Sequence, residues 1–130
     1  MNLFLFFDIP LMPIPLMQVA HRVPIYHCDI RWDNVIHKIG DKSKWLLIDW
    51  EDAAIPPTKA RPTFSKSNHS PAIFSDGHGA EVDIWAIGYP IKTSRAIDIS
   101  PDLKRLGERI CEESESLSAE EVLKLLNNCP

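Results

Sequence analysis

The chain has 130 residues, 45% of them hydrophobic and 25% charged, with a formal net charge of −4. This size suits one domain with a hydrophobic core, and the composition excludes a chain that is disordered throughout. The Lys and Arg residues are scattered, so no nucleic acid partner is expected. Three widely spaced cysteines and five dispersed histidines predict no disulfide framework and no transition metal, and they favour an intracellular, cytoplasmic setting.

Residues 1–22 are expected to form an apolar, proline-rich leader. No Lys or Arg precedes the apolar run, and Asp8 interrupts it. Pro10, Pro13 and Pro15 would break a helix well short of a membrane span. We therefore expect an extended leader that covers apolar surface and no membrane partner, with a targeting role as the alternative.

Residues 23–130 predict an α+β domain that is mainly helical and carries a small β-hairpin. Two runs rich in β-branched and large apolar residues, 35–39 and 45–48, are joined by a turn at 40–43. A long surface loop with several prolines and serines follows. Three helices are then expected, at 80–92, 101–112 and 118–128. The first is apolar all round, which indicates a buried central helix.

The polar residues of greatest chemical interest lie on both sides of the hairpin. The stretch 27–34 reads HCDIRWDN, and the second strand leads into Asp49. Carboxylate and amide oxygens are the ligands that Mg²⁺ prefers, so Asn34 and Asp49 are the candidate metal and cofactor-binding residues. Asp29 and Arg31 are the candidate catalytic residues, because phosphoryl transfer needs a carboxylate at the accepting hydroxyl and a cation near the phosphate oxygens.

Four segments together resemble eukaryotic-type protein kinases, and a fungal branch of kinase-like proteins in particular. The pattern HxDxxxxN at 27–34 looks like the catalytic loop, 48–51 stands where that family carries DFG, 69–72 resembles the APE segment, and 83–88 resembles DxWxxG. The resemblance implies a kinase C-terminal lobe that binds ATP and Mg²⁺ and acts on protein Ser/Thr through a protein substrate or binding partner. It also implies an activation-type loop at 49–72 and a bond from Asp83 to the catalytic-loop backbone.

The resemblance stops short of a complete enzyme. No glycine precedes Gly40 and no lysine precedes Lys38, so the N-terminal lobe that grips ATP is expected to be absent. We therefore expect weak activity or none, and enzymatic status stays open. The alternatives are a non-catalytic pseudokinase-type binding module, a fragment of a small-molecule kinase of the aminoglycoside or choline type, and a truncated gene product.

Overall fold

The computed structural model describes residues 13–95 and 99–130. Its elements, in chain order, are α2 (Pro13–Arg22), the 3₁₀ turn η1 (Trp32–Asn34), β1 (Val35–Lys38), β2 (Asp41–Leu47), the 3₁₀ turn η2 (Pro71–Phe74), α3 (Glu81–Lys92), α4 (Pro101–Glu112) and α5 (Ala119–Asn127). The described residues thus form a small, mainly helical domain with four α-helices and one two-stranded antiparallel hairpin. Within those ranges, every helix is too short or too polar to cross a bilayer.

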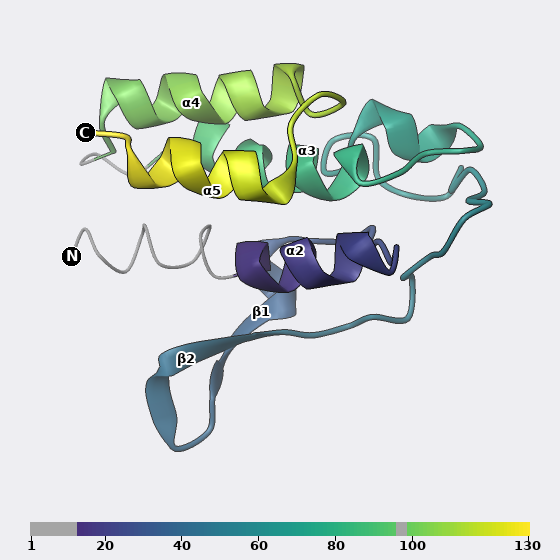
Figure 1. The fold of residues 1–130 in the computed structure, drawn as a ribbon, viewed down its shortest axis with the longest axis horizontal. Coiled ribbons are helices and arrows are strands. Elements are labelled where there is room, and N and C mark those ends of the chain that lie inside the picture. Colours follow the sequence, from purple (N-terminus) through teal and green to yellow (C-terminus); the bar gives the residue numbers. More distant parts are fainter. Residues whose placement is uncertain (1–12, 96–98) are drawn as a thin grey trace.

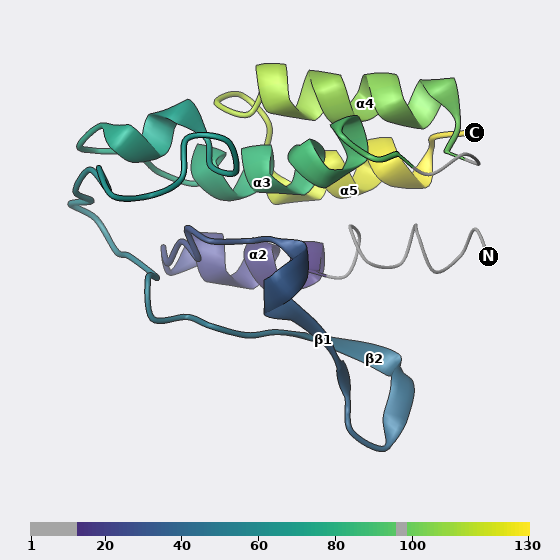
Figure 2. The same ribbon diagram turned by 180° about the vertical axis from the view of Figure 1, so that it is seen from behind.

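The helices are stacked, and the hairpin projects from one side of the stack. Helix α4 packs on α3, α5 contacts α4, and α2 contacts α5 from the other side (Figure 1). The hairpin of β1 and β2 extends away from α2, and the segment that follows β2 runs around one end of the molecule to reach η2 and α3 (Figure 2). This long return brings the loop before α3 back toward the residues that precede β1.

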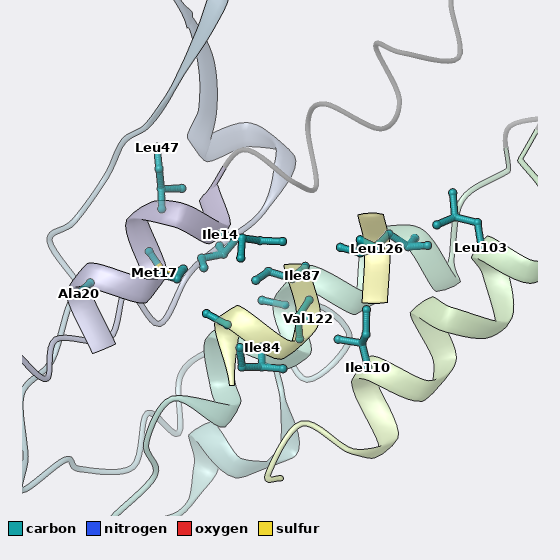
Figure 3. Packing of buried hydrophobic residues seen from close by; sticks show 14 residues of the cluster. Ile14, Met17, Ala20, Leu47, Ile84, Ile87, Leu103, Ile110, Val122 and Leu126 are labelled. Carbon is teal, nitrogen blue, oxygen red and sulfur yellow. The ribbon is translucent and has the colours of Figure 1, made fainter. Parts of the chain in front are cut away.

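Helix α3 is the centre of the core, as its all-round apolar pattern predicts. Ile84 and Ile87 are almost fully buried and pack with Ile110 of α4 and Val122 of α5 (Figure 3). Gly88 of α3 lies so close to α4 that an added Cβ would be 2.8 Å from the carbonyl oxygen of Gly107. The absence of a side chain therefore sets the distance between these two helices.

Helix α2 corrects the extended leader expected from the prolines. Pro13 and Pro15 both lie in the first helical turn, where the backbone N–H groups have no partner within the helix and proline costs little. Ile14 and Met17 are fully buried and belong to the main core (Figure 3). Residues 13–22 are therefore a core helix, and the rest of the expected leader, residues 1–12, lies outside the described residues.

The hairpin is confirmed, with a longer second strand than expected. Val35 pairs with Leu47 and Lys38 with Asp41, and the register shifts between His37 and Lys38. The connection is therefore tighter than the turn predicted at 40–43, and Gly40 adopts a φ of 84° there, which suits glycine. The two C-terminal helices begin where predicted, with the side chains of Ser100 and Ser118 accepting from the backbone N–H of Leu103 and Glu121.

Candidate functional site

The segment before the hairpin is fixed to the core by one buried carboxylate. Asp83 of α3 is fully buried, and its Oδ2 accepts from the backbone N–H of His27 at 2.9 Å while its Oδ1 accepts from that of Cys28 at 2.9 Å. The ring Nε2 of His21, on α2, also lies 2.9 Å from Oδ2. The predicted bond between Asp83 and this backbone is confirmed, and it joins α2, α3 and residues 27–28 at one point.

This anchoring holds Cys28 in an uncommon conformation. Its φ is 70°, in the left-handed region. The backbone N–H groups on either side of it, those of His27 and Asp29, both donate hydrogen bonds. Burial, with the nearby charge of Asp83 as the next cause, raises the pKa of the Cys28 thiol to about 12. The thiol is therefore a structural group and not a nucleophile at neutral pH.

Asp29 follows directly and is surrounded by hydrogen-bond donors. Its Oδ2 lies 3.2 Å from the amide nitrogen of Asn34, which also donates to the Asp29 carbonyl oxygen at 2.8 Å. Its Oδ1 lies 2.8 Å from Nε2 of His69 and 3.9 Å from Nε of Arg31. Because the Asp29 side chain is only 15% exposed, these contacts fix both carboxylate oxygens.

Asn34 and Asp49 are connected through the end of the hairpin. The backbone N–H of Ile48 donates to the carbonyl oxygen of Asn34 at 2.8 Å, and the carbonyl oxygen of Ile48 lies 2.9 Å from Nε2 of His27. Asp49 comes next, with a φ of 63° and an exposed side chain. Among the described residues its carboxylate has neither a hydrogen bond nor an ion pair, which sets it apart from Asp29 and Asp83.

Arg31, like Asp49, is loosely held. Its side chain is 45% exposed, and within the described part of the chain its ion pairs are with Asp29 and, at 3.8 Å, with the exposed carboxylate of Asp33. A pocket of about 270 Å³ opens beside it, lined by residues 30–33, by Asn68 and by the C-terminal half of α3 around Tyr89. The guanidinium is therefore available to a ligand that enters this pocket.

His69 is a site residue that the sequence did not identify. It is 40 positions from Asp29, and only the return of the long loop brings the two side chains together. Its other ring nitrogen, Nδ1, lies 2.9 Å from the carbonyl oxygen of Ser65. Both ring nitrogens thus lie within hydrogen-bond distance of an oxygen atom. No spacing in the sequence indicates this contact.

The fold and this cluster define a class in structural terms: a small, mainly helical domain with a polar site between a hairpin and a returning loop.

No family model matches the chain. The chain is 38% identical over 118 residues to Crinkler effector protein 8 of Phytophthora infestans, and the match covers 84% of this chain. It covers 20% of the relative, so the chain spans about a fifth of that protein's length.

These comparisons correct the family assignment made from the motifs. The chain is similar to an oomycete effector, and no kinase family model matches it, so membership of a fungal kinase-like branch is wrong. The functions that depended on that assignment are wrong with it: a phosphotransferase acting on protein Ser/Thr, a pseudokinase-type module and an aminoglycoside- or choline-type kinase fragment. The motifs are short, and their order alone did not identify the family.

Proposed function

We propose that this chain is a segment of a Crinkler-type effector, and that its hairpin edge binds Mg²⁺ together with a nucleotide such as ATP. The similarity to Crinkler effector protein 8 supports the first part. The proposed binding of Mg²⁺ and nucleotide is supported by the residues at the base of the hairpin, whatever family the chain belongs to. In this proposal Asn34 and Asp49 hold the cation, and Asp29 and Arg31 lie beside the bound phosphates.

The observation that carries the proposal is the state of Asp49. A left-handed backbone is uncommon for a residue other than glycine, and such positions gather at functional sites. The side chain held in this conformation is an exposed carboxylate without a hydrogen bond or ion pair to any described residue. Because this conformation brings the carboxylate no hydrogen bond and no ion pair within the described residues, we infer that it presents the carboxylate to a ligand.

The donor set fits a cation that arrives with its phosphates. In the described ranges, no cluster of three or more His, Cys, Asp or Glu side chains is placed to hold a metal. Mg²⁺ typically takes one or two carboxylates from the protein and fills its remaining positions with water and substrate phosphates. Asp49 and the amide oxygen of Asn34 supply such a partial set. We therefore expect Mg²⁺ and nucleotide to bind together, and Mg²⁺ alone to bind weakly.

Arg31 and the adjoining pocket give the site a place for a protein partner. The exposed guanidinium supplies a cation for phosphate oxygens, which Mg²⁺ would not fully neutralise. In this proposal a side chain of the partner enters the pocket lined by residues 30–33. We propose an intracellular, cytoplasmic setting, in line with three cysteines that are all free, two of them buried.

The test is calorimetric titration of the purified chain with ATP in the presence of Mg²⁺. We expect binding to the wild type and a loss of affinity of about tenfold or more in Asp49→Asn, which removes one charged metal ligand. Glu51→Gln is the matched control, because it removes an exposed carboxylate two residues away. Absence of binding to the wild type at millimolar ATP, or equal losses in the two variants, would refute the proposal.

A further inference from the structure

His69 is held more firmly than the loop residues around it. Its side chain is 10% exposed, whereas residues 65–68 are all exposed. The ring packs against that of Phe64, with centroids 4.6 Å apart, and its two nitrogens contact Asp29 and the carbonyl of Ser65. The loop therefore places a largely buried imidazole, with both ring nitrogens near oxygen atoms, against the carboxylate of Asp29.

The contact continues from Asp29 to Asn34. The amide nitrogen of Asn34 donates to both the side chain and the backbone carbonyl of Asp29. Because the nitrogen is committed to these acceptors, the amide oxygen is the atom left for a cation. A rotation of the Asp29 carboxylate would remove one of the two acceptors that fix this orientation. His69 prevents that rotation by bonding the opposite carboxylate oxygen.

We propose that His69 is a positioning residue for the Mg²⁺–nucleotide site, acting through Asp29 on Asn34. This inference rests on the proposed function. Groups that hydrogen-bond to a metal ligand determine which of its atoms faces the ion. Substituting such a group therefore typically lowers metal affinity by about tenfold or more. The loop before η2 is in this way part of the site, although none of its residues is placed to touch the cation.

The first test compares Mg²⁺-dependent and Mg²⁺-independent binding in variants of His69. His69→Ala should weaken the affinity for Mg²⁺–ATP about tenfold, and should change the affinity for ATP in EDTA less than about twofold. His69→Gln, which keeps a donor for Asp29, should recover part of the loss. The control is Ser67→Ala, an exposed residue on the same loop that does not line the pocket beside Arg31, and it should bind as the wild type does.

Three outcomes of this test would overturn the proposal. Unchanged affinity in His69→Ala would show that Asn34 needs no support from the loop. Tighter binding would show that His69 obstructs the site. An equal loss with and without Mg²⁺ would show that the substitution damages the fold and does not act on the cation.

A second test does not involve nucleotide. The N–H of Arg61 donates to the carbonyl oxygen of Ile73 in η2, and the N–H of Phe64 donates to that of Arg61, so amide hydrogen exchange at these two residues reports whether the loop with His69 is docked on Asp29. His69→Ala and Asp29→Asn should each accelerate this exchange about tenfold. The double variant should be no faster than either single variant, because both substitutions break the same contact between His69 and Asp29. Additive effects would overturn the positioning role. If the wild type binds no Mg²⁺–ATP, the proposed function fails. The exchange rates of the two single variants and the double variant then decide by themselves whether His69 positions Asp29.

Discussion

Replacing Asp83 by Ala should destabilise the protein by about 3 kcal/mol. The substitution leaves the buried N–H groups of His27 and Cys28 without acceptors, and each unsatisfied buried donor costs about 1–3 kcal/mol. The ring of His21 also loses its partner. The two donors together would cost about 2–6 kcal/mol. Removing the fully buried carboxylate also removes the free energy that its burial costs, and this offsets part of the loss. We therefore expect a net loss of about 3 kcal/mol.

Urea denaturation followed by far-ultraviolet circular dichroism measures this loss. A loss of about 3 kcal/mol is a large share of the 5–15 kcal/mol that stabilises a typical domain, so the midpoint should fall clearly. Glu115→Ala is the matched control, because it removes an exposed carboxylate and should change stability by no more than about 0.5 kcal/mol. A loss below about 1 kcal/mol in Asp83→Ala would show that Asp83 does not hold the segment before the hairpin.

Two further predictions concern the helix packing and the thiols. Gly107→Ala should lower stability by about 1–3 kcal/mol, because the added Cβ would lie 2.6 Å from the Lys92 backbone nitrogen; an unchanged melting temperature would contradict this. Burial raises the thiol pKa of Cys28 to about 12 and that of Cys111 to about 11, so a thiol reagent at pH 8 should label Cys129 first, and equal labelling rates would contradict this. Because unfolded thiols ionise near 9.0, the contribution of these two thiols to stability should be constant below about pH 9, and stability measured by urea titration should fall as the pH rises from 9 toward 12.

Local features of the sequence predicted most of the elements correctly. The serine caps at positions 100 and 118 set the starts of α4 and α5, and the apolar pattern around Ile84 indicated a buried helix. These features succeed because capping and periodicity act within a few residues. Asn34 and Asp29 are similarly close in sequence, so their contact follows from a local turn.

The sequence failed where packing outweighed a local rule. Prolines at 13 and 15 predicted an extended leader, yet burial of Ile14 and Met17 against the core makes a helix there, with both prolines in its tolerant first turn. Short motifs in the right order also suggested a kinase family that the comparisons do not support. The metal and catalytic roles of Asp29, Arg31, Asn34 and Asp49 stay predictions.

The sequence by itself determined α3, α4, α5, the hairpin and the polar residues on either side of it, because these depend on neighbours in the chain. Only the tertiary structure decided that His69 contacts Asp29, and that Asp83 of α3 bonds both to His21 of α2 and to the backbone of residues 27–28. Both contacts join residues at least 40 positions apart. Such contacts depend on how the whole chain packs, and no spacing between residues in the sequence encodes them.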